Sequence, residues 1–321
     1  MDMVLERGRI TTRDGWTLPV FRGVRPGKPA GGRPVLMVPG YGMNSHLFRF
    51  HPDRGSFMEA LLDAGLDPWA VDLRGASTTT APRRGAPVRL SDQAFQDLPA
   101  AVEHVREATG HATVHAIGCS LGGSLLYAYA AGAARPRIDR LVAMGSPLRW
   151  SGSRLHRVFS ASSLVTGTFQ MRGSRFMARA ALPFAARFMQ PALRIYLNPR
   201  ITRLDRAADL CLTVEDPIPS INREIAAWIH SRDLVLDGVD VVRELARFDR
   251  PLLVVTADGD GICDRGSAMS VAGIPRGPVT HLDVGHHTGQ KVGHADLFVH
   301  DHAPERVYQP IAAFLNGDPC H

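Results

Sequence analysis

Apolar positions along the chain follow two different spacings, and the two alternate. Short apolar runs of buried-strand length occur within 34–39, 68–73, 112–118, 138–146, 250–260 and 279–284. Segments with helical spacing lie between or after them, at 56–65, 91–110, 124–134 and 303–315. Two further β runs within 8–23 flank an Arg-Asp-Gly turn and predict a hairpin. The alternation predicts an α/β fold with a mostly parallel, doubly wound sheet.

The alternation stops between about 147 and 248. This stretch is helix-like throughout, and its prolines divide it into short pieces. We therefore expect a helical cap, residues 147–248, inserted into a core formed by 1–146 and 249–321. The alternative is a set of helices that pack on the flank of the core without a role at the site, because insertions in loops are well tolerated.

Composition agrees with a single core. The chain has 321 residues, of which 45% are hydrophobic, enough for one large α/β domain. Its first residues carry charges where a secretory signal needs an apolar stretch, and no window approaches the roughly 18 apolar residues of a membrane span. We therefore expect a cytoplasmic protein. The four cysteines lie far apart and form no Cys-x-x-Cys pair, so they are expected to be free thiols.

The formal net charge of +6 is concentrated in one segment. No Asp or Glu lies between Asp139 and Asp205, whereas arginines recur throughout that stretch, interleaved with Phe, Met and Leu. Such a surface suits amphiphilic or anionic small molecules better than a nucleic-acid backbone, so no nucleic-acid partner is expected. It also predicts weak contact between the cap and a lipid surface. The alternative is that the arginines only solvate the outer faces of helices.

One turn carries a signature of nucleophilic catalysis. The sequence GCSLG, residues 118–122, lies between a predicted strand and a predicted buried helix. This context turns the G-x-S-x-G match into a nucleophile elbow, with Ser120 at its centre and Cys119 only beside it. The N–H of Leu121, at the start of the helix, points to where an oxyanion would form. A second donor is expected from the Pro-Gly-Tyr-Gly loop after an earlier strand, and our candidate is the N–H of Tyr41.

A serine nucleophile needs a base, and the base needs an acid to orient it. Carboxylates follow a late strand at Asp258, Asp260 and Asp264. Asp260 is favoured because it lies just past the strand end between two glycines, whereas the other two are typical of turns or helix caps. Histidines crowd the C-terminal stretch, so the base is harder to assign. His286 directly follows a strand, and His294 precedes the last helix.

These histidines have an alternative use, a metal site that also includes Asp296 and Asp301. Their spacing lacks a clean i, i+4 pair on a helix, and a metal site would leave the elbow unexplained. We therefore expect no metal and no other cofactor.

Several of these motifs resemble a known superfamily. The elbow, the VPGYG loop, the segment FMEALLDAGLDPWAVDLRG and the C-terminal GHADLFVHDHAPERVYQPIAAFL are together similar to the α/β-hydrolase superfamily. Within it they resemble the acid lipases and the related lipase-like and polyhydroxyalkanoate-synthase-like hydrolases. In the lipases the catalytic histidine lies in an Asn-His-Leu-Asp-Phe type motif, which GHADL at 293–297 matches in role. The resemblance therefore favours His294 over His286 as the base. It covers both halves of the core but not the cap.

The chain departs from those families in ways that bear on its chemistry. The lipases usually carry a histidine in the oxyanion loop and before the nucleophile, where this chain has Pro39 and Cys119. Polyhydroxyalkanoate synthases carry cysteine at the nucleophile position, which Ser120 occupies here, and this favours hydrolysis over polymerisation. Haloalkane dehalogenases and epoxide hydrolases would need aspartate at that position.

The sequence thus predicts a serine ester hydrolase of esterase or lipase type. Ser120, His294 and Asp260 are its expected triad, and the N–H groups of Tyr41 and Leu121 its expected oxyanion hole. The cap should supply an apolar pocket bordered by arginines, so the expected substrate is a small-molecule ester with an apolar acyl or alcohol group. The alternatives are an acyltransferase with the same triad and a non-catalytic small-molecule-binding protein of this fold.

Overall fold

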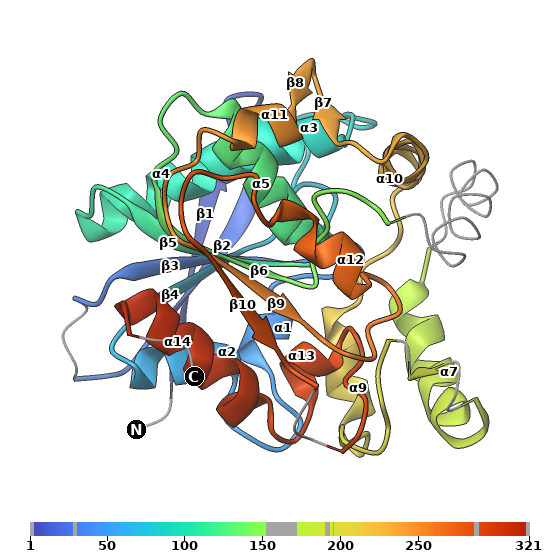
Figure 1. The fold of residues 1–321 in the computed structure, drawn as a ribbon. Coiled ribbons are helices and arrows are strands. Elements are labelled where there is room, and N and C mark those ends of the chain that lie inside the picture. Colours follow the sequence, from blue (N-terminus) through green and yellow to red (C-terminus); the bar gives the residue numbers. More distant parts are fainter. Residues whose placement is uncertain are drawn as a thin grey trace.

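The fold is built on one eight-stranded sheet (Figure 1). The computed structural model describes residues 3–27, 31–151, 172–189, 193–194, 196–285 and 289–318. The strand order is β1-β2-β4-β3-β5-β6-β9-β10, in which β2 is antiparallel to both β1 and β4 and the remaining neighbours are parallel. The bounds are β1 Val4–Thr11, β2 Thr17–Val24, β3 Pro34–Val38, β4 Asp67–Val71, β5 Val114–Cys119, β6 Ile138–Met144, β9 Leu252–Thr256 and β10 Val279–Asp283. The predicted mostly parallel sheet and the N-terminal hairpin are both confirmed.

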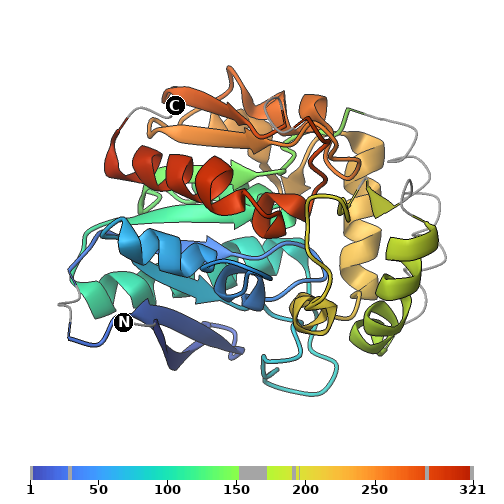
Figure 2. The ribbon, with the colours of Figure 1, turned by 90° about the horizontal axis from the view of Figure 1, so that it is seen from below.

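Helices cover both faces of this sheet (Figures 1 and 2). Strand side chains alternate between the two faces, so that Leu36 and Val38 of β3 join one apolar cluster while Val35 and Met37 join the other. The first cluster packs under α4, α5 and α11, and the second under α2, α13 and α14. The bounds are α1 His46–Arg49, α2 Phe57–Asp63, α3 Leu90–Asp92, α4 Leu98–Thr109, α5 Leu121–Gly132, α11 Val241–Leu245, α12 Arg265–Ala268, α13 Asp296–Val299 and α14 Gln309–Asn316, with a 3₁₀ turn η3 at Met269–Val271.

Two proline residues interrupt helices in the same way. Pro99 lies in the first turn of α4, directly after the π-helical turn η1, Gln93–Asp97. Pro310 lies in the first turn of α14, after the π-helical turn η4, Pro304–Tyr308. A proline has no N–H to offer the preceding turn, and the wider turn accommodates that loss without ending the helix. The segment around Pro99 is thus divided into α3, η1 and α4.

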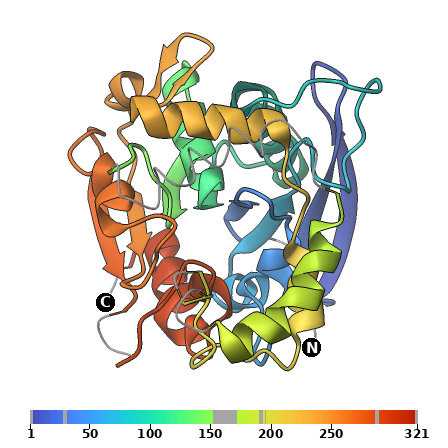
Figure 3. The same cartoon turned by 90° about the vertical axis from the view of Figure 1, so that its right-hand side faces the viewer.

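The insertion between β6 and β9 is not wholly helical. Its helices are α7 Ser174–Phe188, α9 Ala207–Leu210, the 3₁₀ turn η2 Cys211–Thr213 and α10 Pro219–Ser231, and they lie on one side of the molecule (Figure 3). A short hairpin of β7, Val235–Leu236, and β8, Val239–Asp240, follows them. Its turn residues Asp237 and Gly238 both have positive φ angles, as a two-residue hairpin turn demands. The next helix, α11, packs on α5 of the core.

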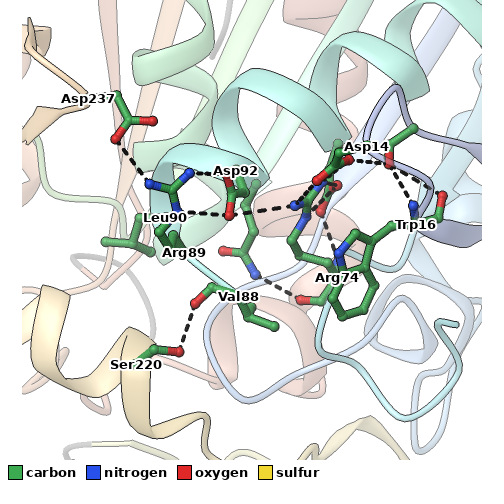
Figure 4. Close-up of polar contacts among 12 residues, drawn as sticks. Asp14, Trp16, Arg74, Val88, Arg89, Leu90, Asp92, Ser220 and Asp237 are labelled. Atoms are coloured by element: carbon green, nitrogen blue, oxygen red, sulfur yellow. Dashed lines mark hydrogen bonds and ion pairs between the residues drawn. The ribbon is translucent and has the colours of Figure 1, made fainter. Parts of the chain in front are cut away.

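A buried arginine anchors the loop after β4 (Figure 4). The guanidinium of Arg74 is fully buried and lies 2.7 Å from Asp14 and 2.7 Å from Asp97, which is equally buried. Burial raises the pKa of Asp97 to about 6, while the adjacent Arg74 opposes that rise. Through these two contacts Arg74 joins Asp14, in the turn of the N-terminal hairpin, to Asp97 in η1. Nearby, Ser220 at the start of α10 donates a hydrogen bond to the carbonyl of Val88 and so ties α10 to the same loop.

No helix in the described part of the chain is long and apolar enough to cross a membrane.

Candidate active site

The predicted elbow is a tight turn between β5 and α5. Ser120, its central residue, has φ +50° and ψ −121°, a strained conformation for a residue with a side chain. Both flanking glycines are required by close packing. A Cβ on Gly118 would lie 2.3 Å from the Cα of Gly123, and one on Gly122 would lie 2.4 Å from the carbonyl oxygen of Val38. Strain of this kind is retained at functional sites, so the turn favours Ser120 as a reactive residue.

The thiol of Cys119, next to Ser120, is buried and unreactive. Cys119 ends β5 and is 1% exposed, with its side chain in the apolar cluster beneath the sheet. Burial, followed by the nearby charge of Asp260, raises the pKa of the Cys119 thiol far above its usual range. Because the thiolate is the nucleophilic form of cysteine, Cys119 is a structural residue at neutral pH.

The structure brings Asp260 and His294 together. Nδ1 of His294 lies 2.6 Å from Oδ2 of Asp260, and both side chains are buried. The other carboxylate oxygen of Asp260 accepts hydrogen bonds from the backbone N–H groups of Ile262 and Cys263, each at 2.8 Å. The carboxylate is therefore fixed in orientation, and Nε2 is the ring nitrogen of His294 left to face other groups.

Gly145 links this pair to the elbow. The N–H of Ser120 donates to the carbonyl of Met144, the residue before Gly145. Gly145 has φ +54°, and a Cβ on it would lie 3.0 Å from Cε1 of His294 and 3.1 Å from Oδ2 of Asp260. The imidazole thus packs against the turn that pairs with the backbone of Ser120. Ser120, His294 and Asp260 follow different strands but gather at the carboxyl ends of the parallel strands, where sites of such sheets lie.

The other two candidate acids, Asp258 and Asp264, are engaged in hydrogen bonds away from His294. Asp258 accepts a hydrogen bond from the N–H of Val292, and Asp264 caps α12 by accepting from the N–H of Ser267. Asp264 has the cap role that the sequence predicted, whereas the carboxylate of Asp258 joins two segments that lie 34 residues apart. The alternative base, His286, lies outside the described residues. Among the residues that are described, no group of three or more His, Cys, Asp or Glu side chains could hold a metal ion.

Asp296 holds the turn that precedes His294 in place. Its carboxylate accepts hydrogen bonds from the N–H of Gly293 at 2.7 Å, the N–H of Asn198 at 2.9 Å and the hydroxyl of Thr202 at 2.6 Å. Burial raises the pKa of Asp296 to about 6, while these donors act in the opposite direction. The carboxylate thus ties the turn before His294 to the middle of the insertion.

The loop after β3 touches the elbow directly. A Cβ on Gly40 would lie 3.0 Å from the Cβ of Ser120, so only glycine allows this approach. The next residue is Tyr41, the predicted second donor. Leu121, the predicted first donor, begins α5, where helix geometry provides no intrahelical acceptor for its N–H. A cavity of about 40 Å³ lies beside the two residues and is lined in addition by Leu125 and Ile221.

The insertion holds this loop from the other side. The hydroxyl of Tyr41 donates to Oδ1 of Asn222 on α10, and burial raises the pKa of Tyr41 to about 12, so that the hydroxyl stays protonated. Glu215 donates its N–H to the carbonyl of Gly42 at 2.7 Å, and its carboxylate accepts from Nδ2 of Asn44 at 2.6 Å. The residues that position the loop therefore come from two parts of the insertion.

Sequence reasoning missed Gly145, Glu215 and the positioning contacts of Asp296. Gly145 does have a local signal, because a glycine directly after a strand often marks a place where another group approaches the backbone closely. Glu215 has no local signal, because its partners lie more than a hundred residues earlier in the chain.

Comparison with known proteins agrees with this architecture. A family model described as the alpha/beta hydrolase fold matches residues 33–289, whereas no curated protein sequence matches the chain. An esterase from Thermogutta terrifontis superposes with a TM-score of 0.62 at 18% identity, over 97% of this chain and 98% of the other. The esterase EaEST from Exiguobacterium antarcticum superposes with a TM-score of 0.64 at 14% identity, over 97% and 100%.

The same fold also carries other chemistry. The bottromycin epimerase BotH superposes with a TM-score of 0.59 at 17% identity, over 97% of this chain and 99% of the other. At such identities the likeness shows the fold alone. The match of the family model nevertheless spans most of the core, and it confirms the superfamily resemblance drawn from the sequence motifs. The chain belongs to the alpha/beta hydrolase fold family.

Proposed function

We propose that the chain is a serine hydrolase that cleaves carboxylic esters with an apolar acyl or alcohol group. The observation that carries the proposal is the buried His294–Asp260 pair, packed through Gly145 against the turn that presents Ser120. A nucleophile in a strained elbow, a base and an orienting acid from three separate segments form the constellation that acyl transfer needs. The esterases among the structural neighbours are consistent with it.

In this mechanism Ser120 attacks the ester carbonyl and gives its proton to Nε2 of His294. Asp260 keeps the proton of the imidazole on Nδ1 and stabilises the imidazolium that forms. The N–H groups of Leu121 and Tyr41 hold the negative charge on the carbonyl oxygen. His294 then protonates the leaving alcohol, and an ester bond to Ser120 remains.

Water completes the cycle. His294 takes a proton from the attacking water, the bond between Ser120 and the acyl group breaks, and the proton returns to the serine. In this proposal the apolar group of the substrate would contact Leu121, Leu125 and Ile221, which line one part of the cavity beside the oxyanion loop. Arg74, Gln93, Glu215 and Asp216 also line this cavity. No metal or cofactor takes part in these steps.

A fluorophosphonate probe tests the proposal, because it reacts with activated serines whatever their natural ester. The wild-type chain should gain one probe mass on the peptide that contains Ser120, and Ser120→Ala should gain none. His294→Ala should label at least a hundredfold more slowly. Cys119→Ala is the matched control, since it removes the adjacent nucleophile and should still label.

Two outcomes would overturn the assignment. Labelling that persists at full rate in His294→Ala would move the base to another histidine, of which His286 is the candidate. A wild-type chain that takes up no probe would point to a binding protein of this fold. Hydrolysis is separated from acyl transfer by the products formed when an alcohol is added, because an acyltransferase would return a new ester instead of the acid.

A further inference from the structure

Helix α7 exposes an apolar stripe. Most of the large apolar side chains exposed in the described part of the chain lie on α7 or directly after it. Met177, Phe184 and Phe188 follow each other at spacings of seven and four residues and so share one face of the helix. They are 54%, 59% and 67% exposed, and the rings of Phe184 and Phe188 pack together with their centroids 4.9 Å apart.

The orientation of this stripe is fixed by the opposite face of the helix. At the start of α7, the N–H of Ser174 donates to Asp216, and Arg175 donates both to the carbonyl of Val214 and to the carboxylate of Glu215. Leu182 lies on this side and is only partly exposed. The stripe is therefore exposed on a helix that is held at its first turn. Helix α7 itself lies at the edge of the molecule (Figure 3).

The charges carried by α7 itself are all positive. Arg187 is exposed three residues after Phe184, and its guanidinium lies 5.9 Å from the centroid of the Phe188 ring. Arg179 is also exposed, but it follows Arg175 by four residues and so lies on the side of the helix away from the stripe. No acidic residue occurs in the sequence between Asp139 and Asp205, so no residue of α7 itself neutralises Arg187. Exposed phenylalanines beside an arginine are typical of helices that lie in the surface of an anionic bilayer.

We propose that α7 docks on an anionic lipid surface, with Met177, Phe184 and Phe188 entering the headgroup boundary and Arg187 on a lipid phosphate. This docking needs no catalytic step, although it would bring the site next to apolar esters if the proposed hydrolase activity holds. Phosphate groups in a membrane match both the charge and the apolar stripe, whereas a soluble anion would leave the stripe exposed.

Vesicle flotation tests the docking. The Ser120→Ala chain is used, so that failure of the proposed chemistry cannot affect the result. It should float with vesicles of phosphatidylcholine and phosphatidylglycerol at least tenfold more tightly than with phosphatidylcholine alone, and salt should weaken the binding. Phe184→Ser together with Phe188→Ser should lose at least tenfold, and Arg187→Gln alone should lose about fivefold.

Matched controls lie at other places on the surface. Val235→Ser removes an equally exposed apolar side chain from β7, and Arg250→Gln with Arg276→Gln removes two exposed charges before β9 and β10, at the amino end of the sheet. These controls should bind like the parent chain. Equal binding by the α7 variants and the controls, or no preference for anionic vesicles, would overturn the proposal. A concentration-dependent dimer that the Phe184/Phe188 variant abolishes would show instead that a second copy covers the stripe.

A second inference concerns the oxyanion loop and rests on different contacts. Glu215 is 8% exposed, and its carboxylate accepts hydrogen bonds from Nδ2 of Asn44, from both the N–H and the hydroxyl of Ser77, and from Arg175. Its own N–H holds the carbonyl of Gly42, the residue directly after Tyr41. One carboxylate thus joins the loop after β3, the loop after β4 and the insertion.

We infer that Glu215 is a positioning residue for the oxyanion loop, an inference that rests on the proposed hydrolase function. Glu215→Gln keeps the shape of the side chain but replaces one acceptor oxygen by an NH₂ group, which neither Nδ2 of Asn44 nor the N–H of Ser77 can accept from. The loop should shift, and because an oxyanion donor acts in the transition state, kcat should fall about 10- to 100-fold with little change in KM.

Glu224→Gln is the control, because Glu224 on α10 accepts from the N–H of Leu90 and joins the insertion to the core without touching the oxyanion loop. A merely structural role for Glu215 predicts equal losses of kcat in the two variants at matched thermal stability. That result, or an unchanged kcat in Glu215→Gln, would refute the inference. Failure of the proposed function would appear separately, as a wild-type chain that does not label.

Discussion

Gly145 offers the most direct test of the His294–Asp260 pair. Replacing it by alanine has two effects that the structure separates. The first is a backbone cost, because φ is +54° and a side chain disfavours that conformation by about 1–2 kcal/mol. The second is steric, because the new methyl group would lie 3.0 Å from Cε1 and 3.1 Å from Nδ1 of His294, and 3.1 Å from Oδ2 of Asp260.

The size of the second effect follows from these distances. Carbon atoms in ordinary contact lie about 3.5–4.0 Å apart, so the imidazole must move by several tenths of an ångström. A displacement of about 1 Å can cost about a hundredfold in rate, and roughly a tenfold loss of kcat is therefore expected for Gly145→Ala. The cost to stability should stay within about 1–2 kcal/mol, a shift of a few degrees in Tm.

Gly110→Ala is the matched control. Gly110 has φ +71° and ends α4, at the opposite end of β5 from Ser120, and nothing lies within 4 Å of an added Cβ. Both variants should lose similar stability in thermal unfolding, but only Gly145→Ala should slow fluorophosphonate labelling and ester hydrolysis. If Gly145→Ala keeps the rate of Gly110→Ala, then the pair beside it is not the base and acid of the reaction.

Three further predictions follow from buried groups. Arg74→Met should cost about 3–5 kcal/mol of unfolding free energy, because it leaves the buried carboxylate of Asp97 without its partner, and chemical denaturation that shows less than about 1 kcal/mol would contradict this. Asp296→Asn should lower the rate of Ser120 labelling by loosening the turn before His294, and an unchanged rate at equal stability would speak against that role. Burial lowers the pKa of His115 from 6.5 to about 4, so its contribution to stability is present above pH 6.5 and is lost as the pH falls towards 4. Between pH 7 and pH 5 the loss is about 2 kcal/mol, and His115→Asn should show a correspondingly flatter pH dependence of unfolding.

The core could be predicted because its signals are local. Each parallel strand is an apolar run, and the elbow is a contiguous pattern in which Gly118 is needed by a contact with nearby Gly123. Asp260 was identifiable by its place just past β9. The choice of His294 depended on the family resemblance, because several histidines share similar surroundings in the sequence.

The insertion was predicted less well, for two physical reasons. Its hairpin has a local signal, the Asp237-Gly238 turn, and the expectation of short helices throughout the insertion overlooked it. The contacts of Glu215 and Asn222 have none, since a hydrogen bond between residues far apart in the chain leaves no periodicity to recognise. The positions of Leu182 and Phe184 likewise need the structure, because both are apolar and only packing decides which faces outward.

Two parts of the insertion have separate consequences for the proposed reaction. Asn198 and Thr202 hold Asp296 and so the turn before His294, whereas Asn222 and Glu215 hold the loop that contains Tyr41. A change at Asn222 should therefore alter stabilisation of the oxyanion while leaving the His294–Asp260 pair in place. Tyr41→Phe, which keeps the backbone N–H and removes only the bond to Asn222, should lower kcat severalfold and leave the pH dependence of the base unchanged. A shifted pH profile would show that the contact between Tyr41 and Asn222 also acts on His294, and would refute this separation.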